Sequence, residues 1–582
     1  MKQRLKWILP VIMMGLLAGC LNPCQKISTP VSRNSTRLAF FDFENGVDVA
    51  LKIDPALATV TDDPTEVISG KYSLKLDTMA DGKGLKDFVS TVAKQLPLQG
   101  GKRYELNFNY RVLDLGEDGH FYYSAETSKG ITIHPWRRYF REQVGDPGFY
   151  RRKMVFPPDE SGGTICIGVN NQASMIIDNI EIRQLQDFHL NAGIVDENSA
   201  NYEPYGVCTH FTWVRGMPVA DHPNWYSASN KQSKVSWIVS EETDKKEDEV
   251  EIDVGYTDDQ VVEGVRLIKE AGIQWFRADA SWADMEPKRG VYCQEKLDRL
   301  DLVVKEAERH DLDLYILLFS NPRWASERPE DEDFWAYAPS DMQVWKDYVR
   351  FIAERYKGKV TYWEIGNEID WVFWRSDLEK FAQYLKVAYE CLKDVDPDNQ
   401  VIMSGQAFDG TFTYRFRPGA EENALQKLYD AGIKDYCDIL AIHPYAHSWH
   451  NATVKSLDSI NNFYSIMKAN GDGDKPIWIT ELGESRVSLK KLAKRELGYE
   501  ITEQEAECAQ SECCRKLYAE LIKHPKIDKI FWYTFRDSQC EYAVANEYGF
   551  LKMDMSPHPV YNMFKALPKT GQRIFSPQFL ED

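Results

Sequence analysis

The chain has 582 residues, is 43% hydrophobic and 27% charged, and carries a formal net charge of −20. This length exceeds what one ordinary hydrophobic core accommodates, so the sequence predicts two or more domains. The composition is that of a globular protein. Because so acidic a chain repels phosphate backbones, it is predicted to bind no nucleic acid.

The first residues have the pattern of an export signal. MKQRLKWILPVIMMGLLAGC has a basic start, an apolar run too short to span a membrane, and a small-residue cleavage site. LLAGC resembles a bacterial lipobox, which implies lipid attachment at Cys20; plain signal cleavage beside an ordinary cysteine is the alternative. We therefore expect a lipoprotein signal peptide at residues 1–19 and a flexible tether at 20–37. The mature protein would be anchored to a membrane of the bacterial cell envelope, on the periplasmic or the cell-surface side.

The eleven cysteines do not form a disulfide framework in a chain of this size. Cys166, Cys208 and Cys437 lie in apolar runs and are predicted to be buried thiols. A bridge from Cys508 to Cys540 after export stays open, because spacing alone does not establish a pairing. No CxxC pair with metal-site spacing occurs in the sequence.

Residues 38–185 consist of short alternating runs separated by Gly, Asp and Pro. The clearest runs are RLAFFDFE, YSLKLDT, RYELNFNYRVL, HFYYSAE, RRKMVF, TICIGVN and SMIIDNIEI. Several such strands without intervening helices predict an all-β sandwich. FFDFENG, SGKYSLKL and MIIDNIEI resemble jelly-roll carbohydrate-binding modules, which implies a jelly-roll sandwich domain over this segment.

Four aromatic residues of this segment are candidates for a sugar-stacking platform: Tyr122, Tyr123, Trp136 and Tyr139. The alternative is that they are core or edge residues. In that case the sandwich would be an accessory domain that binds no glycan.

After a linker at residues 186–202, the pattern changes to strands that alternate with amphipathic helices over residues 203–582. The strand-like runs are YGVCTHF, IQWFRADASW, LDLYILLFSNP, VTYWEIGNE, QVIMSGQAF, CDILAIHPYA, KPIWITELGE and IDKIFWYTFRD. Eight such units predict an α/β fold of the (β/α)8 TIM-barrel type. An open doubly wound sheet is the rival, but no glycine-rich nucleotide loop follows the first strand. The long first connection contains SEETDKKEDEVEID, which is predicted to be a solvated surface.

Two glutamates stand at the end of the fourth predicted strand, in YWEIGNEIDW. By alternation, Glu364, Gly366 and Glu368 share one side of the strand. Residues at the carboxyl ends of barrel strands face the active-site mouth. Glu368 is therefore predicted to meet a substrate, whereas Glu364, about two layers deeper, is predicted to lie in a buried polar network.

The seventh strand supplies a partner, because IWITELGE places Glu481 at the same height; Glu484 in the following loop is the weaker candidate. Strands four and seven lie nearly across a barrel from each other, so these carboxylates can flank one bond. Retaining glycoside hydrolysis needs two carboxyls about 5–5.5 Å apart. One attacks the anomeric carbon, and its charge raises the pKa of the other, which protonates the leaving oxygen.

With these residues, the segment from about Tyr202 to Leu567 resembles the clan A glycoside hydrolases. The resemblance implies that Glu368 in WEIGNE is the acid/base and Glu481 in WITELG the nucleophile. GVCTHF, FRADASWADMEPKRGVY, HPY and YGFLKMDMSPHPVYNMF are most similar to glycoside hydrolase family 39, which contains β-xylosidases, α-iduronidases and some exopolysaccharide-cleaving endo-enzymes. Family 5 is a near neighbour, and Gly366 stands where family 39 sequences often have Trp. A β-linked substrate follows from this resemblance.

Other strand ends supply candidate substrate-binding residues. Arg277 is predicted to orient the nucleophile and to lower its pKa, with a structural salt bridge as the alternative. Asn367 is placed to bind the sugar 2-hydroxyl. His443 and Tyr445 share a face of the sixth strand and are predicted to contact Glu481 or the sugar. His210, at the end of the first strand, is a candidate hydroxyl ligand.

Aromatic residues at strand ends are candidates for stacking on sugar rings. Trp532 is one, unless the register of the eighth strand turns Tyr533 inward instead. Trp282 and Trp324 are further candidates, with rim packing as the alternative.

The histidines of HPYAHSWH, namely His443, His447 and His450, suggest a metal site at first. Zinc sites on a helix need His at i and i+4 on one continuous face, but Pro444 stands at the start of this run and no acidic base falls inside it. We therefore predict neither a metal nor another cofactor.

The sequence thus predicts an exported, lipid-anchored retaining glycoside hydrolase that acts on a polysaccharide or oligosaccharide. A non-catalytic glycan-binding surface protein and a transglycosylase on the same fold are the alternatives. The identity of the sugar and the choice between endo and exo cleavage stay open.

Overall fold

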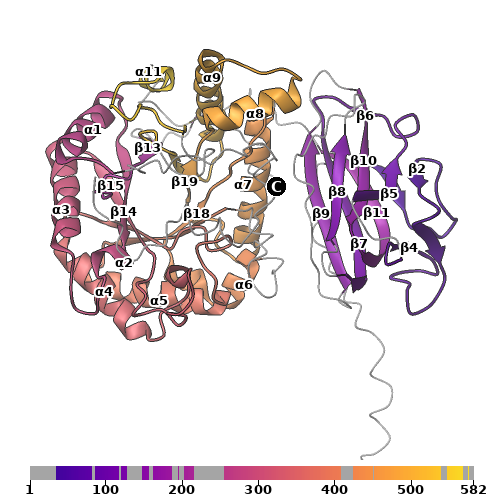
Figure 1. Cartoon of the computed structure of the whole chain (residues 1–582), viewed down its shortest axis with the longest axis horizontal. Helices are drawn as coiled ribbons and strands as arrows, with labels where there is room; N and C mark the ends of the chain where they lie inside the picture. Colours follow the sequence, from indigo (N-terminus) through magenta and orange to yellow (C-terminus); the bar gives the residue numbers. More distant parts are fainter. Residues whose placement is uncertain are drawn as a thin grey trace, which may run out of the picture.

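The computed structural model describes residues 35–80, 85–116, 120–126, 147–155, 161–185, 194–195, 202–214, 255–407, 424–449, 451–538, 547–567 and 574–575. Two bodies lie side by side in Figure 1: an amino-terminal β unit (residues 35–185) and a barrel (residues 202–567). The predicted signal peptide, Cys20 and most of the predicted tether lie outside the described residues. Among the helices of the described part, none is long and apolar enough to cross a membrane.

The β unit is built from two antiparallel sheets. Its strands are β1 (Ser35–Phe41), β2 (Leu51–Ile53), β3 (Ala58–Thr61), β4 (Ser73–Asp77), β5 (Leu85–Thr91), β6 (Leu98–Gln99), β7 (Arg103–Leu115), β8 (His120–Glu126), β9 (Pro147–Val155), β10 (Ser161–Asn170) and β11 (Ala173–Leu185). One sheet has the order β3-β4-β11-β7-β9, with β1 also paired to β11. The other has the order β2-β5-β10-β6, with β8 also paired to β10.

The two sheets share one hydrophobic core. Strand β10 shows why, because Ile165, Ile167 and Val169 alternate along it and all three point into the common core. Phe108 of β7 and Phe121 of β8 meet them there from the two sheets. The alternating runs of the sequence therefore form two layers that pack face to face.

Two of the three tyrosines of the predicted stacking platform are buried. Tyr123 is 1% exposed and belongs to the core, and Tyr122 is 2% exposed. The hydroxyl of Tyr122 donates a hydrogen bond to Asp87 Oδ1 at 2.7 Å. In this structure the two rings are packing residues, which was the alternative; Trp136 and Tyr139 lie outside the described residues.

The barrel is a closed ring of parallel strands. They are β13 (Tyr205–Cys208), β14 (Trp275–Ser281), β15 (Asp313–Phe319), β16 (Tyr362–Ile365), β17 (Gln400–Gln406), β18 (Ile439–Ile442), β19 (Ile477–Leu482) and β20 (Ile527–Trp532). Each strand pairs with the next, and β20 pairs with β13. This closure confirms the predicted barrel and excludes the open sheet, because an open sheet would leave β13 and β20 unpaired with each other.

Helices surround the strands in Figure 1. They are α1 (Asp258–Glu270), α2 (Trp282–Met285), α3 (Gln294–Arg309), α4 (Met342–Arg355), α5 (Leu378–Val395), α6 (Ala424–Asp430), α7 (Ala452–Ala469), α8 (Arg486–Glu496), α9 (Glu503–Leu521) and α11 (Pro559–Lys565). Short 3-10 helices run over Phe334–Ala336 and Ile433–Tyr436, and β12 (Ile194–Val195) pairs with β21 (Ile574–Phe575). Two helix starts are fixed by capping boxes, Thr257 with Gln260 at α1 and Thr502 with Glu505 at α9.

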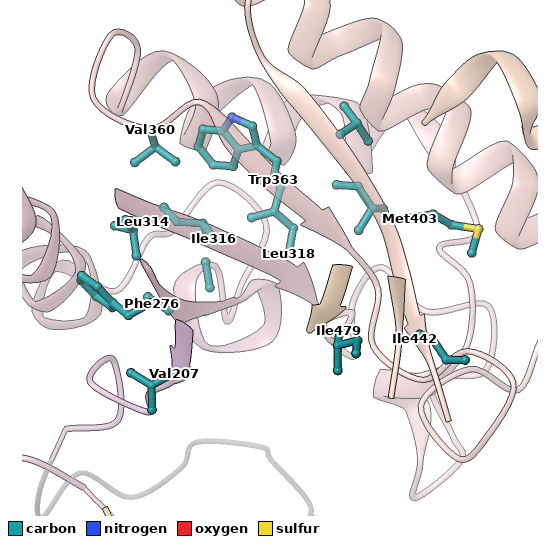
Figure 2. Close-up of a cluster of buried hydrophobic side chains, with 14 of the residues drawn as sticks. Val207, Phe276, Leu314, Ile316, Leu318, Val360, Trp363, Met403, Ile442 and Ile479 are labelled. Carbon is teal, nitrogen blue, oxygen red and sulfur yellow. The ribbon is translucent and has the colours of Figure 1, made fainter. Parts of the chain in front are cut away.

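Strand alternation divides the barrel's apolar residues between two cores. Trp275 and Trp478 point into the barrel, where they pack with Phe531. Their neighbours Phe276 and Ile479 point outward, into the layer between strands and helices that Figure 2 shows. Burial of one such large side chain contributes about 1.5–3 kcal/mol, so strands that are apolar on both faces belong in a ring covered by helices.

The β unit touches the barrel at helix α7. Arg103 of β7 forms a buried ion pair with Asp458, and Lys153 of β9 donates a hydrogen bond to Asn462 Oδ1 at 2.9 Å. Burial, together with the neighbouring arginines, holds the pKa of Lys153 below its ordinary value despite the opposing charge of Asp458. We call this set of four side chains the α7 contact.

Buried thiols occur in both bodies, as predicted. Cys166 of β10 is 6% exposed, and Cys208 and Cys437 in the barrel are 0% and 3% exposed. The thiol of Cys208 donates to the carbonyl of Thr480 at 3.1 Å. Cys508 is an exposed free thiol, and its possible partner Cys540 lies outside the described residues.

Candidate active site

Glu368 reaches the barrel mouth through a break in strand geometry. Strand β16 ends at Ile365, and both Gly366 (φ 78°) and Glu368 (φ 40°) then adopt the left-handed backbone region. A Cβ atom on Gly366 would lie 2.9 Å from the ring of Phe381, so glycine is required there. The predicted simple alternation through Glu368 is therefore wrong, although the predicted position of its side chain at the mouth is right. The Glu368 N–H donates to Gly405 O at 2.9 Å and holds this turn in place.

Glu368 and Glu481 meet around one imidazole. His443 Nδ1 lies 2.8 Å from Glu368 Oε1 and 3.7 Å from Glu481 Oε2. One carboxylate oxygen of each glutamate and a ring nitrogen of His443 all lie within 4.8 Å of one another. Glu368 is 6% exposed, Glu481 is 7% exposed and His443 is fully buried. The pair predicted from strands four and seven is thus brought together.

Two further side chains bind Glu481. Arg277 Nη2 lies 2.7 Å from Glu481 Oε1, and the Tyr445 hydroxyl donates to Oε2 at 3.2 Å. Burial and the charge of Glu481 raise the pKa of Tyr445 well above its ordinary value, so the phenol stays protonated as a donor. The predicted contacts of Arg277 and Tyr445 with Glu481 are confirmed.

The two carboxyls titrate in opposite directions. Burial raises the pKa of Glu481, but the charges of His443 and Arg277 outweigh burial, and the net pKa is lowered. Burial also raises the pKa of Glu368; His443 opposes this only in part and the charge of Glu481 adds to it, so the net pKa is raised. These opposite shifts mean that Glu481 ionises first as the pH rises, while Glu368 keeps its proton to higher pH.

A buried polar layer lies beneath the pair, as predicted for Glu364. Its Oε1 accepts hydrogen bonds from Gly405 N at 2.9 Å and from the Thr480 hydroxyl at 3.0 Å. The Thr480 oxygen in turn lies 3.0 Å from His443 Nε2. Burial raises the pKa of Glu364 above its ordinary value. These contacts join the floor of the site to its mouth.

His210 is linked to the site through Asp279 and Arg277. Its Nδ1 lies 2.9 Å from Asp279 Oδ2, and its ring stacks on Trp213 with centroids 4.1 Å apart. Asp279 Oδ1 lies 3.4 Å from Arg277 Nε, which links His210 to Glu481. His210 Nε2 and Asn367 Oδ1 are buried and have no hydrogen-bond partner among the described residues. Both predicted ligands therefore keep a free polar atom beside the site.

Two tryptophans predicted to bind substrate lie elsewhere. Trp532 is 0% exposed, stacks on Phe550, and belongs to the core between strands and helices. Trp282 is also 0% exposed and stacks on Tyr348 in the same core. The predictions for Trp532 and Trp282 are corrected, because both side chains point away from the barrel interior. Tyr533, the stated alternative to Trp532, neighbours His210 with ring centroids 5.6 Å apart.

Three site residues were not among the predicted ligands: Asp279, Trp213 and Thr480. A signal existed for Asp279, because it stands two residues beyond Arg277 on the same face of β14. Thr480 precedes Glu481 and points to the opposite face in an ideal strand, and Trp213 lies beyond the end of β13. Alternation alone therefore points to neither of these two.

The remaining candidates lie beside the pair. Glu484 is 2% exposed and pairs with His447, whose Nδ1 lies 3.2 Å from Glu484 Oε1. The ring of His447 stacks on Tyr445 with centroids 5.7 Å apart, and His450 lies outside the described residues. Within the described ranges, the group of side chains able to hold a metal ion is Glu368, His443 and Glu481, which includes His443 of HPYAHSWH but not His447.

The fold and the site together define a (β/α)8-barrel protein with two buried carboxylates at the carboxyl ends of opposite strands. The family model described as "Glycosyl hydrolase catalytic core" matches residues 421–564. This match indicates a glycosidase.

Known proteins show the following similarities. A probable mannan endo-1,4-beta-mannosidase A of Aspergillus niger is 28% identical over 207 residues, which are 32% of this chain and 50% of that protein. The chain therefore matches half the length of this curated relative. A family 39 glycoside hydrolase from Bacteroides cellulosilyticus is 17% identical with a TM-score of 0.42, covering 83% of this chain and 79% of that one. The CBM22-1–GH10 modules of a Clostridium thermocellum endo-1,4-beta-D-xylanase are 10% identical with a TM-score of 0.38, covering 92% and 98%.

Proposed function

We propose that the chain is a retaining glycoside hydrolase that cleaves O-glycosidic bonds of a polysaccharide or oligosaccharide. The observation that carries the proposal is the short separation of the carboxylates, since one oxygen of Glu368 and one of Glu481 lie within 4.8 Å. Retaining enzymes hold their carboxyls about 5–5.5 Å apart, whereas inverting enzymes leave about 6.5–9.5 Å for a water molecule.

The electrostatics support the two proposed roles. Glu481, ionised beside Arg277, attacks the anomeric carbon while Glu368 gives its proton to the leaving oxygen. The covalent bond removes the negative charge of Glu481, so the pKa of Glu368 falls and its carboxylate becomes a base. Glu368 then takes a proton from water, the resulting hydroxide attacks the anomeric carbon, and Glu481 is released as a carboxylate.

Two buried polar atoms support sugar binding beside the pair. His210 Nε2 and Asn367 Oδ1 lack partners among the described residues, and a buried polar atom without a partner costs about 1–3 kcal/mol. Sugar hydroxyls would satisfy both atoms, with Asn367 on the 2-hydroxyl as in the clan A enzymes that the chain resembles. A β-linked substrate, and closeness to family 39, are part of the proposal. Mannan is the first polymer to test, since the curated relative is named a mannanase.

The finer organisation of the chain is also proposed. The β unit, with its two antiparallel sheets around one core, would be a jelly-roll carbohydrate-binding module at residues 38–185. A linker at 186–202 and a catalytic domain at 203–582 would follow. The signal peptide at 1–19, the lipid on Cys20 and the tether at 20–37 would anchor the enzyme to the bacterial cell envelope.

The test compares the mature protein with its Glu481→Ala and Glu368→Ala variants on a panel of polysaccharides and aryl glycosides. We expect both variants to lose at least about 1,000-fold in kcat. Azide should restore turnover of Glu481→Ala as a glycosyl azide of inverted configuration. Glu484→Gln, a change at a buried glutamate of the same segment, is the control and should keep most of the activity.

Two outcomes would overturn the proposal. If Glu481→Ala cleaves a substrate as fast as the parent, the nucleophile is assigned wrongly. If nothing in the panel is cleaved but a glycan binds, the chain is a glycan-binding protein on this fold. A product analysis with an added acceptor sugar separates hydrolysis from transglycosylation.

A further inference from the structure

A continuous row of four side chains runs from the mouth of the site to its floor. Glu368 Oε1 lies 2.8 Å from His443 Nδ1, His443 Nε2 lies 3.0 Å from Thr480 Oγ1, and the Thr480 hydroxyl lies 3.0 Å from Glu364 Oε1. Apart from Glu368, which is 6% exposed, all are fully buried. The proposed reaction uses Glu368 directly, but it gives no role to Thr480 or Glu364.

The direction of these hydrogen bonds follows from one backbone contact. Glu364 Oε1 accepts the N–H of Gly405 at 2.9 Å, and because a carbonyl oxygen accepts better than a hydroxyl oxygen, a proton on this carboxyl is favoured at Oε2. The Thr480 hydroxyl must therefore donate its single hydrogen to Glu364. Thr480 is left with lone pairs toward His443, and His443 Nε2 must carry a hydrogen to bond with it.

The close fit around Gly405 keeps this row intact. A Cβ atom at position 405 would lie 2.0 Å from His443 Nε2 and 2.5 Å from Thr480 Oγ1. Only glycine therefore lets β17 approach the imidazole and the hydroxyl while its own N–H reaches Glu364.

We propose that Glu364 and Thr480 are positioning residues that hold the Nε2–H form of His443, so that Nδ1 shares with Glu368 the proton delivered to the leaving oxygen. This inference rests on the proposed function for its last step. A neutral imidazole with hydrogen on Nε2 presents a lone pair at Nδ1. Between Nδ1 and Glu368 Oε1 there is then one proton, on the carboxyl or on the imidazole, and it is this proton that leaves in the first step.

The second half of the reaction restores the proton. Once Glu368 has protonated the leaving oxygen, its carboxylate faces the lone pair of Nδ1, which strengthens Glu368 as a base. The proton taken from water then returns to the Glu368–Nδ1 pair, and the balance closes. With the other tautomer, an Nδ1–H would stabilise the carboxylate and weaken it as a base.

Carboxylates face His443 from two strands. Glu364 and Glu368 approach from β16 and its end, and Glu481 approaches from β19. The carboxylates outweigh burial and raise the pKa of His443 above its ordinary value. Tyr445, on the segment after β18, stands edge-on to the imidazole with centroids 6.5 Å apart.

The first test is a neutron crystal structure of the parent protein. Deuterium on His443 Nε2, with the Thr480 deuteroxyl pointing at Glu364, is the expected result. Deuterium on Nδ1 with a bare Nε2, or a Thr480 deuteroxyl that points at His443, would overturn the inference. This measurement needs no substrate, so it remains decisive even if the proposed function fails.

The second test is kinetic and compares Thr480→Val, which removes the hydroxyl, with Thr480→Ser, which keeps it. We expect Thr480→Val to slow aryl glycosides with poor leaving groups by about 10-fold, a part of the 10²–10⁴ that general acid catalysis supplies. The rate of hydrolysis of dinitrophenyl glycosides, whose leaving groups need no protonation, should stay nearly unchanged. The basic limb of the pH profile of kcat/KM should move to lower pH. Thr480→Ser should keep the basic limb of the parent's pH profile and the parent's dependence of the rate on the leaving group.

Loss of activity that is equal for good and poor leaving groups would contradict the inference, because a general loss of structure acts on both. Glu364→Gln supplies a further check. Its amide oxygen still accepts from Gly405 and Thr480, so it should behave like Thr480→Ser. If Glu364→Gln moves the basic limb of the kcat/KM profile as far as Thr480→Val does, the row of side chains does not act through the tautomer of His443.

Discussion

The opposite pKa shifts of Glu368 and Glu481 arise from their different neighbours. Arg277 and His443 stabilise the charge of Glu481, whereas Glu368 has burial and a nearby carboxylate against its charge. Activity should therefore rise with pH as Glu481 ionises, below the ordinary glutamate range. It should fall as Glu368 loses its proton, above that range.

Replacing Arg277 should move only the acidic limb of the pH–rate profile, the one that reports ionisation of Glu481. In Arg277→Met the pKa of Glu481 rises, so the acidic limb of the kcat/KM profile moves to higher pH, and kcat/KM at neutral pH falls by about 100-fold. Arg277→Lys keeps a positive charge and should shift the limb less. A pH–rate profile of Arg277→Met with an unmoved acidic limb would show that the ion pair does not control the nucleophile.

The site residues that the sequence predicted correctly are those with a charge or a fixed place at a strand end. Arg277 and Tyr445 contact Glu481, and Glu364 lies in the buried layer. Trp532 was misplaced because both faces of β20 carry one charged residue and at least one large apolar residue, so its pattern does not reveal which face is inward. Asp279 carried a local signal, its place on the same face of β14 as Arg277, but its contact with His210 joins two strands and could not be foreseen.

At the level of the elements, the turn after β16 is the feature most sensitive to substitution. Gly366→Ala places a methyl group 2.9 Å from Phe381 at a φ of 78°. Left-handed strain and overpacking together should lower the free energy of unfolding by about 2–4 kcal/mol. Because Glu368 follows two residues later, kcat should fall as well. Urea denaturation and steady-state kinetics measure the two effects.

Gly358 is the matched control for this prediction. It has a φ of 75°, but a Cβ atom there meets nothing within 4 Å. Gly358→Ala should therefore cost about 1 kcal/mol from strain alone and leave kcat unchanged. Equal losses of stability in the two variants would show that Phe381 yields to the added methyl group.

The barrel strands could be predicted because each lies in an apolar run between amphipathic segments, and the structure places all eight in one closed ring. In the β unit the seven predicted runs are strands, but β2, β3, β5 and β6 were not foreseen. Strand β2 has three residues and β6 has two, too few to show a period. Strand β5 reads LKDFVST, where two charged residues near its start hide the alternation.

In the whole molecule, the α7 contact joins the β unit to the barrel through buried charges. Removal of one partner of a buried ion pair typically costs about 3–5 kcal/mol, while replacement of both by apolar residues is often neutral. Asp458→Leu should therefore destabilise the protein by about 3 kcal/mol, and Arg103→Met in the same chain should restore much of that loss.

Unfolding in urea of both single variants and of the double variant measures this coupling. Glu390→Leu removes half of an exposed pair with Lys386 on α5, and should change stability by no more than about 0.5 kcal/mol. If Asp458→Leu behaves like Glu390→Leu, the two bodies are held together by something other than the α7 contact.

The α7 contact also leads toward the site. Ser456, two residues before Asp458, donates a hydrogen bond to the carbonyl of Pro444 at 2.7 Å, and Pro444 stands between His443 and Tyr445. The contacts that lead from the β unit to the site run through β7, α7 and the segment after β18, which are distant from one another in sequence. No local pattern in the sequence predicts it, for the same reason that the pairing of Arg103 with Asp458 could not be foreseen.

The buried thiols give each body its own chemical reporter. Cys166 is a buried thiol of β10, and Cys208 lies in the barrel interior, where its thiol donates a hydrogen bond to the carbonyl oxygen of Thr480. Burial raises the pKa of both thiols, so an alkylating reagent reacts with either only after the surrounding sheet has opened. The two alkylation rates, followed residue by residue in a mass spectrometer, therefore measure how often each body opens. Equal rates in the parent and unequal rates in Asp458→Leu would mean that a single ion pair makes the two bodies open together.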